Sequence, residues 1–376
     1  MIHHKFSPTI NKEFSVVLRQ RVSDFFKDQS IHQNANSEMI TKTIILLGTY
    51  VTTYFLMLFW APGQLWIAFG LWFLLGVGKA LIGMSVMHDN MHGSYSKKKW
   101  VNQLVGGLST WSIGIDPKIW QIQHNVLHHT YTNIDHADED IESRYIFRFS
   151  PHQPRRWFHR FQHLYAPMFY SLLSLIWIIA KDYVKLFNYK SKGLVKPGAE
   201  FTKHLLWVIV RKVFYMAVFI AIPLWILPYS TGAIIGMFLT MHAVTGLILS
   251  FVFQPAHVVP TSTFTMTEEK EIQQNWQVHQ LLTTSNFGMN NRWLTWLIGG
   301  LNYQVEHHLF PNICHVHYPK LSAIVQKTAA EYNIPYYAQR SFRAAIFNHL
   351  KMLRDLGRKD EIQVAFSPAK LQESFT

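Results

Sequence analysis

The sequence of 376 residues contains a single cysteine, Cys314. One thiol cannot build an internal disulfide framework, a multi-cysteine zinc site or a fused iron–sulfur domain. Any electrons that the protein uses must therefore come from another molecule. The first residues, MIHHKFSPTINKEF, also lack the apolar stretch of a secretory signal peptide, so we do not expect a cleaved leader.

Charge is also scarce, since Asp, Glu, Lys and Arg make up 15% of the chain, against about a quarter in ordinary soluble domains. Aromatic residues are abundant, with 13 Trp, 16 Tyr and 27 Phe, as is usual for proteins that lie in a membrane interface. The formal net charge of +13 would suit nucleic acid, anionic lipid or an acidic protein. Long uncharged runs favour membrane lipid and an acidic protein partner, and we expect no nucleic acid.

Two long segments, 43–78 and 213–267, contain no Asp, Glu, Lys or Arg. Each is longer than the roughly 20 residues that one transmembrane helix needs. Each is also interrupted near its middle by proline and glycine, at Pro62–Gly63 and between Pro228 and Gly232. The pattern predicts two helical hairpins, with spans at about 43–61, 64–87, 213–227 and 233–253.

Lys and Arg are concentrated away from the two uncharged hairpin tips, which places the termini and the 88–212 loop in the cytoplasm. Residues 164–180 form a further apolar run. A fifth crossing there would separate the later histidine-rich segment from the earlier ones, so we expect this run to lie in the membrane interface.

The predicted fold is an all-α integral membrane protein. Its four transmembrane helices form two hairpins, and a cytoplasmic helical cap holds a di-metal site. We divide the chain into a cytoplasmic N-terminal segment (1–42), a membrane domain (43–340) and a cytoplasmic C-terminal tail (341–376).

Three ordered clusters stand out among the 21 histidines. They read MHDNMH, QHNVLHH and YQVEHH, and their members are His88 and His92; His124, His128 and His129; and Gln304, His307 and His308. Asp116–Pro117 before the second cluster is typical of a helix start. Spacings of three and four place side chains of a cluster on one helix face.

Seven histidines exceed the ligands that one metal ion normally takes, because four-coordinate sites are common. The clusters therefore predict two ions sharing one site. Imidazole suits iron, copper, zinc and nickel, so ligand type leaves the metal open. Metal-bound imidazoles usually donate their other N–H to a carboxylate or carbonyl, and the carboxylates closest in sequence are Asp89, Asp135, Asp138 and Glu306. The run 138–140 would also suit a solvated turn.

These motifs together, HDNMH, HNVLHH and QVEHH followed by LFP, resemble the three histidine boxes of membrane fatty-acid desaturases. Glutamine at the start of the third box is similar to front-end (Δ5/Δ6-type) and related bacterial acyl-CoA or acyl-lipid enzymes. The resemblance extends from the second span to about residue 337 and implies a non-haem centre of two iron ions. It also implies a further ligand before the third box, either His257 in FQPAH or His279 in NWQVHQ. Gln304 would be a weak ligand or a donor to metal-bound water.

The resemblance implies a fatty-acyl desaturase that uses O2 and two external electrons to introduce a cis double bond. An HPGG haem motif of a fused cytochrome b5 domain does not occur in the sequence. The chain is therefore similar to the bacterial branch, which works in the cytoplasmic membrane with a separate donor such as ferredoxin. The acyl carrier, whether CoA, acyl carrier protein or glycerolipid, stays open, as does the double-bond position.

Two other functions fit parts of this pattern. A fatty-acyl or lipid hydroxylase would share the scaffold and the ligands. A non-enzymatic metal-binding or transport protein would favour ionisable groups near the bilayer midplane. The histidine clusters instead lie at the edges of the predicted spans, so we favour an enzyme.

Overall fold

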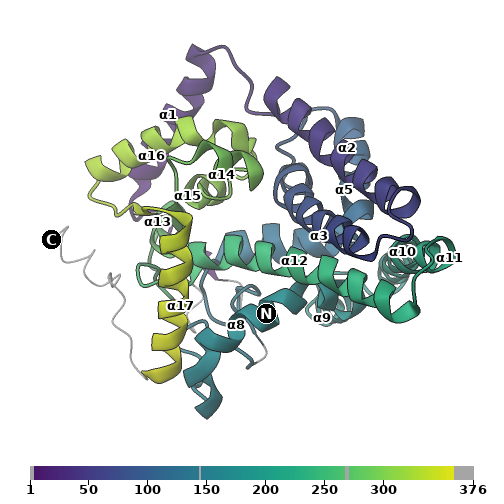
Figure 1. Ribbon diagram of the computed structural model, residues 1–376. Helices are drawn as coiled ribbons and strands as arrows, with labels where there is room; N and C mark the ends of the chain where they lie inside the picture. The colour runs from purple at the N-terminus through teal and green to yellow at the C-terminus, as the bar shows by residue number, and fades with distance from the viewer. Residues whose placement is uncertain (1–3, 144, 267–270, 360–376) are drawn as a thin grey trace. The chain divides into compact units, whose positions relative to one another are not determined.

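The computed structural model describes residues 4–143, 145–266 and 271–359 and is helical nearly throughout (Figure 1). The predicted C-terminal tail, 341–376, lies outside the described residues from 360 onward, and its earlier part forms helix α17 (Phe342–Arg358). The chain forms two units. The first contains residues up to 34, 123–166 and those from 252 onward; the second contains 35–122 and 167–251. The division of the chain into three consecutive domains stays a prediction.

The second unit consists of long apolar helices and their short continuations. They are α2 (Ser37–Phe59), α3 (Leu65–Ile82), η1 (Gly83–Met87), α4 (His88–Met91), α5 (Lys99–Ile113), α6 (Pro117–Gln121), η4 (Trp177–Lys181), α9 (Asp182–Ser191), α10 (Ala199–Met216), η5 (Ala217–Ala221) and α11 (Ile222–Ile226). Helices α8 (Gln162–Ile176) and α12 (Thr231–His257) belong to both units in sequence. Helices α2 and α3 pack against each other as an antiparallel pair (Figure 1).

The four predicted spans match, to within two residues at their ends, parts of continuous helices that are long and apolar enough to cross a membrane. These helices are Ser37–Phe59, Leu65–Met91, Ala199–Ile226 and Thr231–His257. Trp157–Ser191 is a fifth helix of this kind and contains the run that we expected in the interface. It continues through Pro167 and through the π-helical turn η4. The chain is thus a multi-pass helical membrane protein by the length and composition of its helices, and these do not confirm a count of four.

The first unit is made of shorter elements. They are β1 (Lys5–Phe6), α1 (Lys12–Asp28), η2 (Ile122–His128), α7 (His129–Tyr131), η3 (Trp157–Phe161), β2 (Glu271–Ile272), α13 (Trp276–Thr283), β3 (Ser285–Phe287), α14 (Arg292–Leu297), α15 (Gln304–Leu309), η6 (His315–His317), α16 (Tyr318–Glu331), β4 (Tyr337–Gln339) and α17. Two short parallel pairs, β1 with β2 and β3 with β4, fix chain segments that are far apart in sequence.

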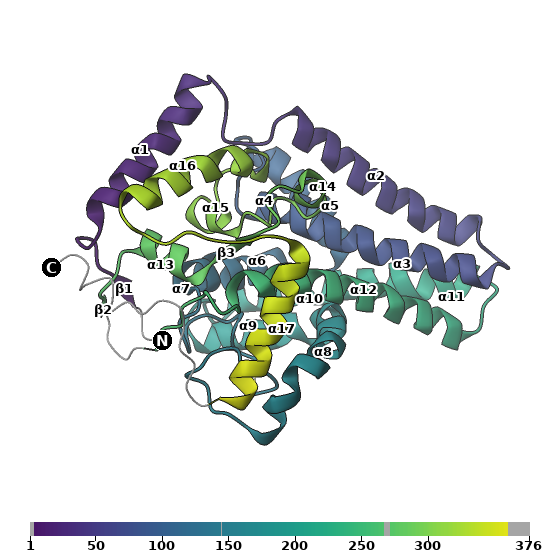
Figure 2. The same ribbon diagram turned by 60° about the vertical axis from the view of Figure 1, so that its left-hand side comes forward.

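Helices α1, α13, α15 and α16 enclose the apolar core of the first unit. Helix α1 runs beside α16 (Figure 2), and its apolar residues recur at helical spacing on the buried face as Phe14, Leu18 and Val22. They join a cluster that includes Leu309 and Tyr318. Removal of this apolar surface from water, worth about 25 cal/mol per Å², therefore holds the third histidine cluster against α1 and α16.

Candidate metal centre

The second histidine cluster lies on a π-helical segment, η2, and on the α7 turn that follows it. The Asp116 carboxylate caps the preceding helix by accepting from the backbone N–H groups of Lys118 and Ile119 at 3.0 and 3.1 Å, as the sequence predicts. A π-helix repeats at i to i+5, unlike the expected α-helix. This repeat brings Nε2 of His129 to 3.2 Å from Nε2 of His124.

The third cluster reaches the second through His307 and His308 of α15, both buried. Nε2 of His307 lies 2.9 Å from Nε2 of His129, and the His308 ring stacks on the His129 ring at a centroid distance of 4.3 Å. Two nitrogens on one ion with metal–nitrogen bonds of about 2.1 Å are separated by about 3 Å when they subtend a right angle. These Nε2 separations therefore match those of ligands that share an ion.

His257, the last residue of α12, completes the cluster from a third part of the chain. Its ring centroid lies 4.8 Å from that of His128 and 4.7 Å from that of His308. Its Nε2 is buried without a hydrogen-bond partner among the described residues. A buried ring nitrogen is costly to leave unsatisfied, and a metal ion would satisfy it.

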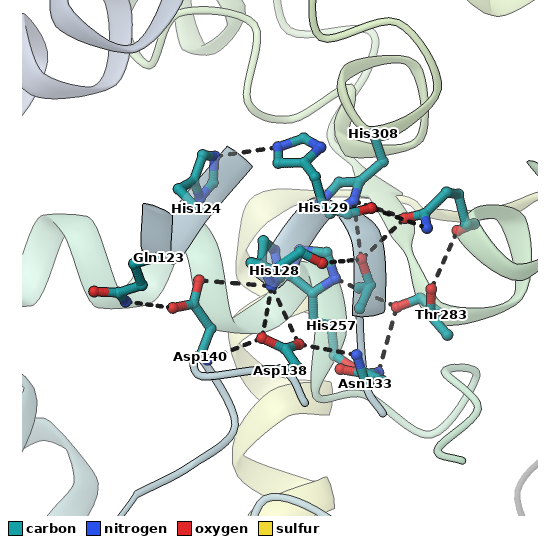
Figure 3. Close-up of polar contacts among 12 residues, drawn as sticks. Gln123, His124, His128, His129, Asn133, Asp138, Asp140, His257, Thr283 and His308 are labelled. Atoms are coloured by element: carbon teal, nitrogen blue, oxygen red, sulfur yellow. Dashed lines mark hydrogen bonds and ion pairs between the residues drawn. The ribbon is translucent and has the colours of Figure 1, made fainter. Parts of the chain in front are cut away.

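Two groups of ring nitrogens within the first unit could hold metal ions. One contains His128, His257 and His308, and the other contains His129, His307 and His308; in each, the possible ligand atoms lie within 4.8 Å of one another. Figure 3 shows four of the histidines concerned, which are His128, His129, His257 and His308. The residues present thus fit an imidazole-ligated metal centre, and their type does not select the metal.

Each of four ring Nδ1 atoms contacts a fixed polar group of the protein. The pairs are His128 with Asp138 Oδ1 at 3.0 Å, His257 with the Thr283 carbonyl oxygen at 3.3 Å, His308 with Gln280 Oε1 at 2.9 Å, and His307 with the Tyr318 hydroxyl at 3.3 Å. An N–H at Nδ1 leaves the lone pair at Nε2 for a metal. The first unit therefore fixes the direction of these rings, and the oxygen acceptors beside His128, His257 and His308 favour an N–H at Nδ1.

Asp138, one of the four acidic residues that the sequence singled out, contacts a cluster histidine of the first unit. Asp89, another of the four, belongs to the second unit. Asp138 contacts His128, and Asp140, which the sequence analysis did not select, lies 3.6 Å from the same ring nitrogen. Burial lowers the pKa of His128, but the two carboxylates outweigh burial and raise that pKa to about 9 in the metal-free protein. The run 138–140 is thus not a solvated turn, because Asp138 is fully buried.

Asp135 and Glu306 have other partners. The Ser150 hydroxyl donates to the Asp135 carboxylate. The buried Glu306 carboxylate accepts from Asn286 Nδ2 and the Tyr336 hydroxyl, both at 2.8 Å. Burial raises the pKa of Glu306 to about 7, and these two donors oppose that rise. Glu306 therefore fixes the start of α15 to β3, because Asn286 Oδ1 also accepts from the Val305 N–H.

His279 lies in the same unit but bonds elsewhere. Its Nε2 is 2.7 Å from the Thr132 carbonyl oxygen, and its Nδ1 is 3.3 Å from Gln274 Oε1. Burial lowers the pKa of His279 to about 4 and keeps the ring neutral. Gln304, which precedes His307 by three residues, is buried. Its Nε2 has no hydrogen-bond partner among the described residues.

The first histidine cluster belongs to the second unit. His88 and His92 lie one turn apart, with ring centroids separated by 4.7 Å, and both contact the edge or face of Trp120 at 5.7 Å. His88 and Asp89 are buried.

Sequence reasoning missed Gln280 and Tyr318, which hold His308 and His307. Gln280 Oε1 also accepts from the Thr132 hydroxyl at 2.9 Å. One amide therefore joins the segment that follows the second histidine cluster to the third cluster. The only signal for Gln280 is its place beside His279, and for Tyr318 its place after the HVH run.

Comparison with known proteins agrees with this centre. The family model described as fatty acid desaturase matches residues 64–340. An acyl-lipid (8-3)-desaturase of Physcomitrium patens is 34% identical over 94% of this chain and 73% of its own length. An sn-1 linoleoyl-lipid 6-desaturase of Arthrospira platensis is 34% identical over 93% of this chain and 94% of its own length. The corresponding 6-desaturase of Synechocystis sp. is 31% identical over 93% and 97%.

The family match includes all three histidine clusters, and the relatives are aligned over nearly the whole chain. Their names support a fatty-acyl desaturase function, which makes the protein an oxidoreductase. The chain belongs to the fatty acid desaturase family.

Proposed function

We propose that the protein is a front-end acyl-lipid desaturase that introduces a cis double bond between an existing double bond and the carboxyl end of the chain. The observation that carries this proposal is the buried cluster of histidines whose Nδ1 atoms are held by Asp138, Gln280 and other groups of the protein. The relatives named as 6-desaturases of linoleoyl lipid support the regiochemistry.

The proposed ligand set consists of eight histidines. They are His88, His92, His124, His128, His129, His257, His307 and His308. We prefer His257 to His279 because only His257 has a buried ring nitrogen without a protein partner. Two iron ions held there would supply the O2-dependent removal of two hydrogens from neighbouring carbons, with two electrons from a separate donor such as ferredoxin. Gln304, with its buried amide, would bind an ion weakly or donate to a bound water.

The chain's own part in the reaction is to orient these groups and to exclude water. Asp138, Gln280 and Tyr318 hold ring N–H groups, so that the Nε2 lone pairs keep one direction. Holding ligand rings in place in this way lowers the reorganisation that metal binding requires.

We further propose four crossings, with Trp157–Ser191 in the interface and the centre on the cytoplasmic side. An even number of crossings places all three histidine clusters on the same face of the membrane. Reporter fusions after residues 60, 192 and 229 test this: we expect the 192 fusion on the cytoplasmic side and the other two outside. A 192 fusion on the outer side would contradict the proposal.

Fatty-acid methyl ester analysis of cells that express the protein and receive linoleate tests the function. We expect a new acid with a double bond on the carboxyl side of the existing one. His307→Ala/His308→Ala should abolish it, whereas His204→Ala, which changes a histidine outside the three clusters, should not. A hydroxy acid instead would identify a hydroxylase on the same scaffold. A purified protein that makes the product and holds no iron would reject the di-iron proposal.

A further inference from the structure

A pocket of about 980 Å³ lies in the first unit, between the C-terminal half of α1 and the segment that follows α15. Neither the histidine cluster nor its Nδ1 partners line it. Its walls include Val22 and Phe26 from α1, Leu309 and Phe310 at the end of α15, and Trp276 from α13. It is as large as the upper range of small-molecule sites.

The charged residues that line this pocket are all of one sign. Arg19 and Lys27 lie on its wall together with His32, and none of the lining residues is Asp or Glu. The lining positions of α1 follow helical spacing, so the acidic residues Asp24 and Asp28 of this helix lie off the pocket face. The pocket therefore favours an anion.

Both cations are exposed, and their contacts lie within their own helix. Within the described residues the Arg19 guanidinium bonds only to its own helix, with Nε donating to the Ser15 carbonyl oxygen at 3.1 Å. Lys27 Nζ lies 3.9 Å from Asp24 Oδ1, and 70% of the Lys27 side chain is exposed to solvent. Arg21, two residues after Arg19, differs: it donates to Glu331 at 2.7 Å and to Thr328 at 3.0 Å, which joins α1 to α16.

Apolar residues of the pocket wall come from the segments that carry the candidate ligands. Leu309 follows His308 directly in α15, and it packs with Val22 and Phe310 in one buried cluster. On the other wall, the Trp276 indole N–H donates to the His129 carbonyl oxygen at 3.2 Å. The same backbone segments thus form the pocket walls and position the candidate ligands.

We propose that this pocket binds the phosphate-bearing end of the carrier that delivers the acyl chain. Arg19 and Lys27 would bind the phosphate oxygens, while Val22, Phe26 and Phe310 would contact the first apolar groups of the chain. This inference rests on the proposed desaturase function. A phosphodiester of a glycerolipid and the phosphates of CoA share this chemistry. The concave shape and apolar wall favour such a small amphipathic ligand over an acidic protein.

Isothermal titration calorimetry on the purified full-length protein in neutral detergent tests the site without requiring turnover. The probes are dihexanoyl phosphatidylglycerol, hexanoyl-CoA and phosphate-free monogalactosyl dihexanoylglycerol. We expect Arg19→Gln/Lys27→Gln to weaken binding of a phosphate-bearing probe about tenfold or more, because two charge-assisted hydrogen bonds are lost. Ser23→Trp, at an exposed position on the pocket wall, should weaken it without any change of charge.

The matched control is Lys12→Gln/Lys320→Gln, which removes two exposed positive charges of the same unit that do not line the pocket. Binding should stay within about twofold of the unchanged protein. If the Arg19→Gln/Lys27→Gln variant loses affinity only for the phosphatidylglycerol probe, the carrier is a glycerolipid. If it loses affinity only for hexanoyl-CoA, the carrier is CoA. Equal affinities in all variants, or tightest binding of the galactolipid, would overturn the proposal. Phosphate binding in a protein that makes no double bond would instead reject only the desaturase function.

Discussion

His128 Nδ1 lies 3.0 Å from Asp138 Oδ1, and both side chains are buried. The Asp138 carboxylate also accepts from the N–H groups of Asn133 and Asp140, each at 2.9 Å. It is therefore fixed before any metal binds, and it fixes the ring in turn.

Asp138→Asn should lower metal affinity by about 10- to 100-fold, as is usual when the partner of a ligand histidine is lost. The amide keeps the size of the side chain but loses the charge that holds the Nδ1 proton. Iron retained after dialysis against graded chelator measures this. Asp28→Asn, at an exposed position of α1, should retain iron like the unchanged protein; equal retention by the Asp138 variant would contradict the role.

The sequence predicted those parts of the molecule that depend on local spacing. The length of the two uncharged segments predicted the positions of four long helices, and Asp116–Pro117 predicted the start of a helix. Most of the groups that hold the ligand histidines could not be predicted, because they come from segments that are distant in sequence. Gln280 reaches His308 across 28 residues, and nothing near His308 in sequence indicates it.

The type of helix was the other feature that residue spacing in the sequence could not predict. We expected an α-helix for 124–128, whereas the segment is π-helical. A π-turn is set by tertiary packing around one extra residue, so propensity does not reveal it. The fifth apolar helix is a similar case, because length and composition alone do not separate a span from an interfacial helix.

Gln280→Leu should reduce iron content and leave the fold largely intact. Leucine fills a similar volume, but it removes the acceptor for His308 Nδ1 and for the Thr132 hydroxyl. The buried hydroxyl then loses a partner, at a cost of about 1–3 kcal/mol. Iron analysis together with thermal unfolding separates the two effects. Gln103→Leu, at an exposed position of α5, is the control. A drop in stability without loss of iron would show that Gln280 supports the fold and not the metal centre.

Two helical glycines should respond oppositely to alanine. A Cβ on Gly357 of α17 would lie 2.0 Å from the His159 carbonyl oxygen, whereas one on Gly48 of α2 meets nothing within 4 Å. Gly357→Ala must therefore displace α17 from η3 and should cost about 1–3 kcal/mol. Gly48→Ala should be neutral or stabilise by up to about 1 kcal/mol. Melting temperatures of the two purified variants measure the contrast, and equal shifts would refute this packing.

The buried His349 makes stability depend on pH. Its Nδ1 lies 2.9 Å from the Val258 carbonyl oxygen, and burial lowers its pKa from 6.5 to about 4. Between these values the unfolded chain binds a proton that the folded chain does not. Stability should therefore fall as pH drops from about 6.5 to 4, by on the order of 2 kcal/mol at pH 5. His349→Gln should show a smaller difference between melting at pH 7.5 and at pH 5, despite a lower melting temperature. His136→Gln, at an exposed histidine, should keep the full difference, and an unchanged difference in the His349 variant would show that this ring does not carry the effect.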